Sequence, residues 1–526
     1  MDGKSQLAPQ APLQAQGAFR WFEGAGQVLW ALLLVTIPFS SHPWVAGLVG
    51  WSTVSPLSAL PLIVLVIAWL PVSVFRTRSL PRAALPLLGF AAAAVFSAGT
   101  AFFIPILPTF DQSILQREIR ALVTLATGIG FYLVASSRAR SEHRLRQSLR
   151  WLYLGGFLLL AYSTFQVVAL PGADDPVPEA LVTLHRLFVV RDPFRSRVTG
   201  FAYEPSWLGN QLVLLYLPLW ISSVARGYSA FEAKLWRLSV EHGLLLWGIV
   251  VLFFSFARLA WLSFALILAA LVVASSGRLA EGLARSGRSE RLAGMVPADR
   301  SGRRRRLVIA IVGVGCLLLA GLVLVLGASA FDERISDALK INLRDTFSGR
   351  HPWPYRLANE LKYAERLMYW VAGFRIFSLY PMVGVGPGNA GFLMPDSVPA
   401  FGLYLPEIIR AVHNGSFGVP NTKSLWIRLL AETGIIGFAL LVTWLVVVAS
   451  LATRLLSSSD GLRRTFGLAG LLALTAQITE GFSLDTFALP QLWVVLGLVT
   501  AASWIEPGPS RRVEAVIDSH SPHDER

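Results

Sequence analysis

The sequence has little cysteine, few histidines and no recognisable metal-ligand spacing. Among its 526 residues there is one cysteine, Cys316, so no disulfide bond within the chain can stabilise a loop. Its 8 histidines show no paired spacing such as H-E-x-x-H, and acidic clusters are sparse. The glycine-rich stretch GVGPGN at 384–389 lacks the Lys-Ser/Thr of a phosphate-binding loop, and we interpret it as a turn. These absences predict chemistry without a metal ion or a cofactor.

Charged residues are also scarce, and long apolar runs take their place. Only 15% of the residues are charged, whereas 54% are hydrophobic and 17 are Trp. Many apolar runs reach the roughly 18 residues that a bilayer crossing requires. We therefore predict an all-α polytopic membrane protein with about twelve transmembrane helices. The predicted spans are residues 27–48, 57–75, 83–106, 119–136, 150–170, 206–225, 242–256, 259–276, 307–328, 424–450, 465–483 and 487–504.

The net charge of +14 could indicate nucleic-acid binding, but the basic residues gather in alternate connections between the spans. By the positive-inside rule these connections are cytoplasmic, so the run GRRRRL at 302–307 is an orientation anchor and we expect no nucleic-acid partner. No cleavable signal peptide is expected before the first span. The predicted organisation is a cytoplasmic tail at 1–26, nine spans within 27–328, a large outer loop at 329–423, three spans within 424–504 and a cytoplasmic tail at 505–526.

Two predicted outer segments, 171–205 and 329–423, are long and basic. Translocated loops of this length tolerate positive charge, but cations beside a membrane suit a substrate whose phosphate groups lie at the membrane surface. The candidate substrate-binding residues in these segments are Arg197, Arg366, Arg410, Asn421 and Lys423. For any single one of them, an ordinary solvated loop residue is the alternative.

Residues 360–380 are predicted to form an amphipathic helix at the membrane interface. The apolar residues that recur at helical spacing on one face are Leu367, Trp370, Phe374 and Phe377. Arg366 and Arg375 are nine positions apart, about half a rotation out of phase. One straight helix can therefore direct only one of these two arginines into a site.

Arg258 interrupts the apolar stretch FFSFARLAWLSF. An arginine in the middle of a membrane helix costs at least about 2.5 kcal/mol, so a tight outer turn is the cheaper arrangement. Such a turn holds the guanidinium at the membrane surface, facing the bundle. Because the guanidinium fork suits two phosphate oxygens, we favour a diphosphate ligand over a structural ion pair.

Glu204 and His413 are the candidate general bases, and Arg258 is the candidate catalytic cation. Glu204 precedes Pro205 at the start of a span, where an acid also gains from the helix dipole without any catalytic role. His413 lies in AVHNGSF; histidine titrates near neutral pH, although a solvated loop histidine is the alternative. The acids in TEGFSLDTF, Glu480 and Asp485, are interpreted as polar groups of an outer turn.

Several of these features occur together in one known family. They are Gly200, Glu204 and Pro205 at the sixth span, Arg258 with Trp261 at a span junction, the stretch YPMVGVGPGNAGF at 380–392 and the stretch SLWIRLLAETGIIGF at 424–438. In this order they resemble the O-antigen ligase and polymerase superfamily, also called Wzy/WaaL-like, over roughly residues 195–450.

The resemblance implies a GT-C-like, metal-independent, inverting glycosyltransferase at the outer face of a bacterial inner membrane. It would move a glycan from an undecaprenyl-diphosphate-linked oligosaccharide donor to a glycan or lipid-linked glycan acceptor. Arg258 matches the family's junction arginine, which looks like the diphosphate-binding one. The family's ligases have a His-Asn pair nine residues before the helix glutamate, and with Glu432 as that glutamate Lys423 occupies the histidine position. A lysine ammonium cannot accept a proton at neutral pH, so the base role falls to Glu204 or His413.

Two features favour a polymerase of surface polysaccharide or exopolysaccharide repeat units: the replacement of the family's histidine by Lys423, and the acidic YEPS motif. An O-antigen ligase is the second choice. Membrane lipids and a polysaccharide export or chain-length-control protein are the further partners considered. The alternative is a transporter or flippase of lipid-linked oligosaccharide, which shares the twelve-span plan. Transporters, however, bind near mid-membrane and often contain two related halves, and no such repeat is recognisable here. A structural scaffold for an export complex has only the basic cytoplasmic loop in its favour.

Overall fold

The computed structural model describes residues 13–50, 53–77, 80–108, 111–170, 176–236, 238–285, 298–330, 333–341, 346–347, 352–414 and 418–505. The described chain is mostly helical, which confirms the predicted all-α class. One short antiparallel hairpin, β1 (Lys234–Leu235) with β2 (Leu238–Ser239), accompanies the helices.

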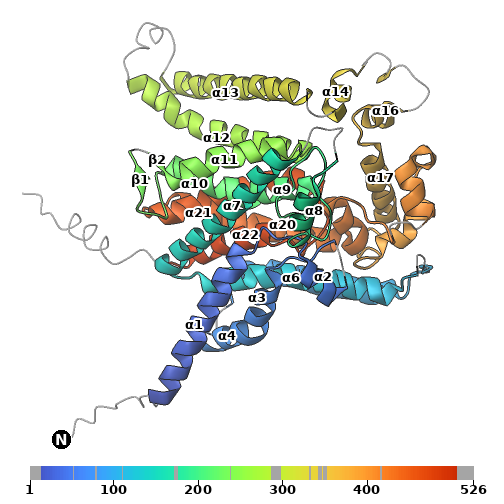
Figure 1. Ribbon diagram of the computed structural model, residues 1–526, viewed down its shortest axis with the longest axis horizontal. Coiled ribbons are helices and arrows are strands. Elements are labelled where there is room, and N and C mark those ends of the chain that lie inside the picture. The colour runs from blue at the N-terminus through green and yellow to red at the C-terminus, as the bar shows by residue number, and fades with distance from the viewer. Residues whose placement is uncertain are drawn as a thin grey trace, which may run out of the picture.

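Most of the long helices run along the long axis of the molecule and form a bundle (Figure 1). In chain order they are α1 (Leu13–Val35), α5 (Leu85–Ala101), α6 (Ile114–Arg138), α7 (Glu142–Ala169), α11 (Val240–Phe254), α12 (Arg258–Arg285), α13 (Ala298–Ala328), α20 (Leu425–Leu456), α21 (Gly461–Glu480) and α22 (Pro490–Ser503). Composite helices complete the bundle, because a π-helical turn joins α3 (Ala59–Val64) to α4 (Leu70–Thr77) and α9 (Pro205–Gln211) to α10 (Leu217–Arg226).

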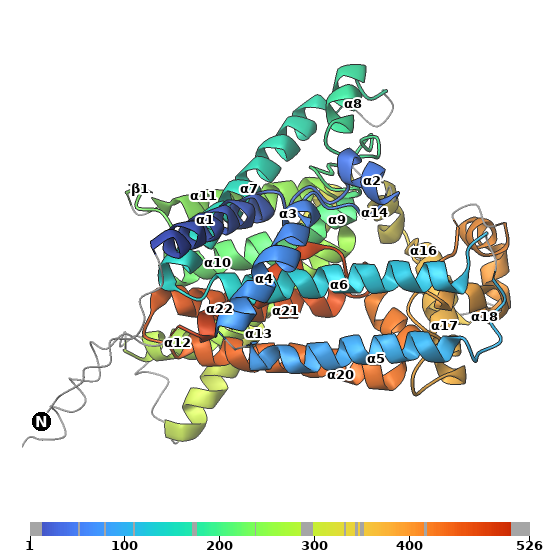
Figure 2. The same cartoon turned by 90° about the horizontal axis from the view of Figure 1, so that it is seen from below.

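Short helices lie beside one end of this bundle, at the right of Figures 1 and 2. They are α16 (Trp353–Glu360), α17 (Ala364–Leu379) and α18 (Met394–Ser397), with α19 (Pro406–Ile408) packed on α17. We call this end the loop end. The opposite end, where α6 ends at Arg138 and α7 begins at Glu142, is called the basic end.

Within the described residues, eight helical segments are long and apolar enough to cross a membrane: Ala59–Arg76, Arg82–Ala101, Ile114–Arg138, Glu142–Ala169, Pro205–Arg226, Arg258–Ser276, Ala310–Ala328 and Leu425–Leu456. The helices Trp21–Val35, Val240–Phe254 and Pro490–Ser503 are apolar but shorter. The chain is a multi-pass membrane protein, as its composition predicts, and the count of twelve spans stays a prediction.

The prediction of one continuous span over 27–48 is wrong, because the second half of this range does not continue the first helix. α1 ends at Val35, and a separate helix, α2 (Pro43–Val49), follows after a turn. Pro38 lies in this turn, where it lacks the N–H that a continuing helix would use. The backbone of the turn pairs instead with Ser55, through hydrogen bonds of 2.9 and 3.1 Å.

α20 is broken at Gly434, whose φ of +62° and ψ of −169° leave the helical region. The glycine-rich segment 381–389 fills the break, so GVGPGN is a turn, as predicted. A side chain at position 434 would collide with the backbone of Met382, which makes glycine necessary there. The backbone hydrogen bonds that join the two pieces run from the N–H of Val385 to Ala431 (3.0 Å), from Gly386 to Glu432 (3.0 Å) and from Ile435 to Pro381 (2.8 Å).

α17 forms where the sequence predicts an amphipathic helix, but it buries a different face. Within the predicted apolar face, Leu367, Trp370 and Phe377 are half-buried and Phe374 is exposed. Close packing on α20 explains the difference, because a Cβ at Gly373 would collide with Ile427. The residues that α17 buries are Ala364, Met368, Tyr369, Ala372, Gly373 and Ile376.

Candidate active site

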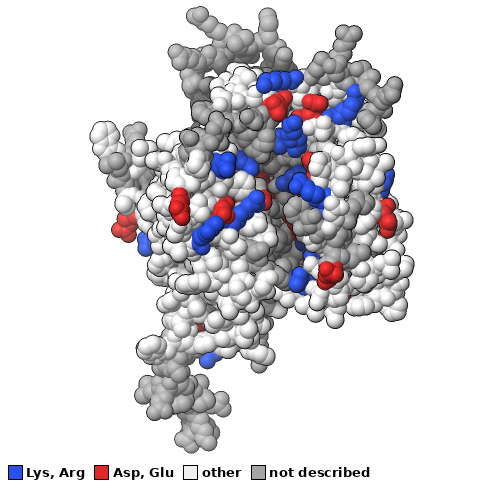
Figure 3. Space-filling model, turned by 45° about the vertical axis from the view of Figure 1, so that its right-hand side comes forward, with Lys and Arg blue, Asp and Glu red and all other residues white. Residues whose placement is uncertain are grey.

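Two adjoining cavities lie at the loop end of the bundle. The large cavity has a volume of about 490 Å³ and the small cavity about 290 Å³. Both are lined by Glu204, Ser206, Arg366 and Ser483, and we call these residues the shared wall. On the face shown in Figure 3, Lys and Arg side chains gather around a hollow in the surface. We treat the two cavities as one candidate site.

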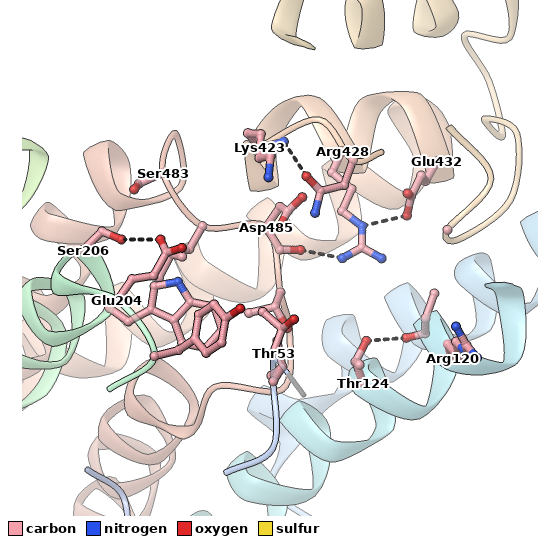
Figure 4. A pocket seen from close by; sticks show the side chains of 18 of the residues that line it. Thr53, Arg120, Thr124, Glu204, Ser206, Lys423, Arg428, Glu432, Ser483 and Asp485 are labelled. Carbon is pink, nitrogen blue, oxygen red and sulfur yellow. Dashed lines mark hydrogen bonds and ion pairs between the residues drawn. The ribbon is translucent and has the colours of Figure 1, made fainter. Parts of the chain in front are cut away.

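The large cavity lies between the N-terminal turns of α6 and α20 (Figure 4). Each of these helices begins at a serine that caps it, Ser113 for α6 and Ser424 for α20. Helix N-termini carry partial positive charge, so both favour an anion in the cavity. The basic residues that line it are Arg117, Arg120, Arg366, Lys423 and Arg428, and the acidic ones are Glu204, Glu432 and Asp485.

Arg428 and Glu432 are one helical turn apart on α20 and form an ion pair, with 2.8 Å between Nε and Oε2. The guanidinium of Arg428 also donates to the backbone oxygen of Asp485 and lies 5.4 Å from the ring centroid of Phe487. These contacts fix the arginine and offset much of its charge.

Lys423 and Asn421, both predicted to bind substrate, line the large cavity. The backbone of Lys423 has a φ of +53°, and its N–H donates to Oδ1 of Asn421 at 3.3 Å. The Nζ atom of Lys423 lies 5.9 Å from the ring centroid of Tyr369 on α17. The loop-end helix α17 thus helps to hold this ammonium group beside the cavity.

Arg258 lines the small cavity and begins α12 directly after a tight turn, in which Phe256 has a φ of +46°. The cost of an arginine in mid-membrane predicts such a turn. The Nη1 atom of Arg258 donates to the carbonyl of Leu361 at 2.8 Å, and the guanidinium lies 4.9 Å from the ring centroid of Tyr363. The other basic residues of this cavity are Arg191, Arg197, Lys362 and Arg366.

Glu204 occupies the N-cap position of α9 and faces both cavities from the shared wall. Pro205 follows it in the first helical turn, as predicted. The carboxylate makes no capping hydrogen bond; it accepts from Nη1 of Arg191 at 2.6 Å and from the hydroxyl of Ser206 at 3.4 Å. Glu204 is therefore an oriented carboxylate beside two cation-lined spaces.

Gln166 of α7 holds the chain that leads to Glu204. Its Oε1 atom accepts from the N–H groups of Thr199 and Gly200 at 3.1 and 2.8 Å. His185, in α8 (Glu179–Arg186), supports the amide from behind, with Nδ1 at 3.1 Å from Nε2 of Gln166. Burial lowers the pKa of His185 to about 4, so the ring is neutral at physiological pH.

Only one of the two arginines Arg366 and Arg375 lines the cavities, as their positions around the helix predict. Arg366 lines both cavities, and its Nη1 donates to the carbonyl of Ser483 at 3.2 Å. Arg375 lines neither cavity, and its Nη1 donates to the carbonyl of Ser397 at 3.1 Å. Arg366 is therefore the arginine of α17 that belongs to the site.

Not every predicted residue reaches the cavities. Arg410 lines neither of them, because its Nε donates to the carbonyl of Pro406 one turn earlier. The backbone of His413 ends a π-helical turn, Ile409–His413, but its side chain lies outside the described residues. Of the two predicted bases, Glu204 is the one whose side chain the structure describes.

Arg258 and Lys423 do not line one common cavity. Arg258 faces the small cavity, Lys423 faces the large one, and Arg366 faces both. The two residues therefore face different spaces, which meet at the shared wall.

The interpretation of Glu480 as a turn residue is wrong. Glu480 is the last residue of α21 and is buried, and its oxygens accept from Nδ2 of Asn210 and from the hydroxyl of Ser263, both at 2.8 Å. Gln491 extends this network by donating to Asn210 at 2.6 Å. A buried acid needs such partners because an unsolvated carboxyl group is costly. Glu480 lines the small cavity from inside the bundle.

Sequence reasoning missed Arg117 and Arg120 of α6 as cavity residues. The signal was present, since basic residues in the first turn of an otherwise apolar helix mark the end of that helix. The same argument led to Arg258. What the sequence could not supply is the approach of α6 to α20 at the loop end.

Within the described ranges, no group of three or more His, Cys, Asp or Glu side chains is arranged to hold a metal ion. Comparison of the chain with models of protein families and with curated proteins gave no match. The geometry of the two cavities and the motifs of the sequence are therefore what points to a function.

Proposed function

We propose that the protein is an inverting, metal-independent membrane glycosyltransferase that transfers or polymerises undecaprenyl-diphosphate-linked glycan repeat units. In this proposal the chain crosses the bacterial inner membrane twelve times in a GT-C-like arrangement. Both termini are cytoplasmic, and the loop end faces the periplasm. A glycan or lipid-linked glycan is the acceptor, and a polysaccharide export or chain-length-control protein is the proposed partner.

The observation that carries the proposal is the shared wall. A carboxylate, Glu204, and a cation, Arg366, both face two spaces that further basic residues line. A diphosphate group is held best by several cations with planar, directed donors. An attacking hydroxyl needs a proton acceptor within hydrogen-bond reach. The shared wall offers both kinds of group in one place.

In the proposed reaction, a hydroxyl of the acceptor attacks the anomeric carbon that carries the diphosphate. Its proton passes to the carboxylate of Glu204, the bond from carbon to the diphosphate oxygen breaks, and the diphosphate leaves with the electron pair. Arg258 and Arg366 stabilise the negative charge that develops on the leaving group. A single displacement of this kind inverts the configuration of the sugar.

Polymerisation of repeat units is favoured over ligation. Lys423 occupies the position at which the ligases of the resembling family have histidine, and it supplies a cation to the large cavity. A direct comparison of acceptors separates the two reactions: lipid-linked repeat units for a polymerase, and the lipid A core for a ligase.

A transfer assay with purified protein tests the proposal. We expect wild-type protein to release undecaprenyl diphosphate from lipid-linked repeat units and to lengthen the glycan. Arg258→Ala should lower the rate of release by at least about 100-fold. Arg186→Ala is the control, because Arg186 pairs with Asp192 at 2.7 Å on the surface and lines neither cavity. Wild-type rates with Arg258→Ala contradict the mechanism, and no release by wild-type protein contradicts the function.

A transporter or flippase of lipid-linked oligosaccharide is the second candidate. The break in α20 at Gly434 favours it, because transporters often bind substrates at broken helices. In this chain, however, backbone groups at the break pair with the glycine-rich segment, which leaves them unsuited to a substrate. Movement of intact lipid-linked oligosaccharide across proteoliposomes, without release of undecaprenyl diphosphate, would establish the transporter.

A further inference from the structure

The lining of the large cavity contains more basic than acidic side chains. Five basic and three acidic side chains face this space. One of the acids, Glu204, forms its ion pair with Arg191, which lines the small cavity and not the large one. A second acid, Glu432, pairs with Arg428. The third acid, Asp485, is left to offset four cations, which are Arg117, Arg120, Arg366 and Lys423.

The positive charge is concentrated around Arg117 of α6. Glu432 and Asp485 attract its guanidinium. Arg120 and Arg428 repel it. Two acids therefore stand against two cations among its charged neighbours, and the charge of Arg117 itself is left over.

Arg117 and Lys423 are accessible to a ligand. Both side chains are half-buried and line the large cavity, so each can contact a ligand without a change in the fold. Within the described part of the chain, no ion pair includes either of them. The Nε atom of Arg117 donates to the carbonyl of Gly388 at 3.3 Å, and Lys423 lies beside the ring of Tyr369. Neither of these contacts neutralises a charge.

Both cations also lie at helix ends that are already positive. Arg117 lies at the end of the first turn of α6, and Lys423 directly precedes Ser424, the cap of α20. Neither helix has an acidic residue in its first turn. Acidic side chains stabilise the N-terminus of a helix, whereas a cation there is unfavourable. The arrangement becomes favourable when an anion occupies the cavity.

The small cavity has cations of its own. Arg197 and Arg258 line it and do not line the large cavity. Arg117 and Lys423 line the large cavity and do not line the small one, and Arg366 faces both. A diphosphate held by Arg258 and Arg366 therefore leaves the other cations of the large cavity without an anion.

We propose that the large cavity binds a second anionic group, carried by the acceptor, while the diphosphate of the donor lies in the small cavity. This inference rests on the proposed function and narrows its acceptor to an anionic one. The second group is either the acceptor's own lipid diphosphate or an acidic sugar in its glycan, since both present anionic oxygens to the same cations. Glu204 faces both cavities and so lies between the two bound substrates.

Titration of geranyl diphosphate into purified full-length protein, measured by calorimetry, tests the inference. This prenyl diphosphate is water-soluble and carries the charged group that both cavities are proposed to accept. We expect two molecules to bind to the wild-type protein. Arg117→Gln and Lys423→Gln should each weaken one of the two binding events about tenfold, and Arg258→Ala should weaken the other.

Two control variants separate charge from structure. Arg117→Lys keeps the cation but removes the Nε atom that donates to Gly388, and we expect it to retain most of the binding. Arg375→Gln, on α17 outside both cavities, should leave both binding events unchanged. The inference is overturned by a single binding event in the wild-type protein, by two events that Arg117→Gln and Lys423→Gln do not affect, or by equal losses with Arg117→Lys and Arg117→Gln.

Competition experiments with Arg258→Ala, in which binding to the small cavity is weakened, identify the source of the anionic group. The competitors are a tetrasaccharide of alternating glucuronate and N-acetylglucosamine and the uncharged chitotetraose of the same length. Displacement of geranyl diphosphate by the charged tetrasaccharide alone supports an acidic sugar, and displacement by neither supports the lipid diphosphate. Equal displacement by both contradicts an anion site.

The outcomes also separate this inference from the proposed function. If two molecules of geranyl diphosphate bind but the wild-type protein releases no undecaprenyl diphosphate, the anion site stands and the transferase proposal fails. If undecaprenyl diphosphate is released but only one molecule of geranyl diphosphate binds, the transferase proposal stands and the second anion site does not exist.

Discussion

The two ends of the bundle use arginine in opposite ways. At the basic end, Arg138 is fully buried, with Nη1 2.9 Å from the carboxylate of Glu23 and its guanidinium 4.7 Å from the ring centroid of Trp69. At the loop end, Arg258 and Arg366 line spaces large enough for a ligand. Arginines of the first kind join helices to one another, whereas those of the second kind border a cavity. The number of basic residues at an end of the bundle therefore says less about function than what encloses them.

The largest effect on stability is expected from Arg138→Ala, which removes the buried partner of Glu23. We expect the free energy of unfolding to fall by about 3 kcal/mol, because the fully buried guanidinium gives up its hydrogen bonds to the carboxylate and the carbonyl of Glu23 and leaves a cavity. Thermal or denaturant unfolding in detergent measures this loss. Transfer activity per folded molecule should not change.

Arg144→Ala is the matched control, because Arg144 reaches the same Glu23 oxygen at 3.1 Å with a side chain that is 41% exposed. Its loss should cost less than about 1 kcal/mol. Equal losses in the two variants would show that burial does not distinguish these arginines.

Arg366→Ala should have the largest effect on activity. We expect the rate of undecaprenyl diphosphate release to fall about 10²- to 10³-fold, since a donor at the shared wall is lost. Unfolding should change by less than about 1 kcal/mol, because the removed bond to Ser483 is a single hydrogen bond. Arg375→Ala, on the same helix but outside both cavities, should keep its activity. A matching loss there would mean that α17 acts only as a scaffold.

A pH titration tests the role of His185, which contacts Gln166 and so supports the segment that leads to Glu204. The pKa of His185 is about 4 in the folded protein, below the value of about 6.5 for an unperturbed histidine. Between these values the unfolded chain binds a proton that the folded chain does not, so stability falls as the pH is lowered from 6.5 towards 4. We expect a loss on the order of 2 to 3 kcal/mol from this residue. His185→Gln does not titrate, and a pH dependence unchanged in that variant would rule His185 out as its source.

The smallest effect is expected from Arg410→Ala. Although its charge and its loop suggest a ligand for phosphate, Arg410 bonds to its own helical turn and lines neither cavity. Stability should change by less than about 0.5 kcal/mol, and transfer should continue at the wild-type rate. A large loss of activity would place the site closer to α19 than the cavities indicate.

Sequence patterns predicted the features that depend on neighbouring residues. Apolar runs located the helices, the cost of a buried guanidinium predicted the turn before Arg258, and Pro205 marked the start of α9. Each of these follows from chemistry within about ten residues of the position in question.

Features that depend on distant contacts were not predictable. Gly434 reads as one more small residue in an apolar helix, because the segment that fills the break comes from about fifty residues earlier. Glu480 reads as a turn residue because Asn210 and Ser263, which hold it, lie on other helices. The two cavities themselves depend on how helix ends meet in space, which no local pattern records.

The glycine-rich segment has a practical consequence for engineering. Its backbone completes α20, and the hydroxyl of Ser97 on α5 lies within hydrogen-bond reach of the carbonyls of Val383 and Glu432, at 2.5 and 2.7 Å, across the junction. The segment between α13 and α20 is therefore not a detachable module. A chimera designed to exchange substrate preference must therefore transplant 329–456 as a unit and keep a small hydroxyl residue at position 97. Otherwise the backbone of the glycine-rich segment loses its hydrogen-bond partners in α20.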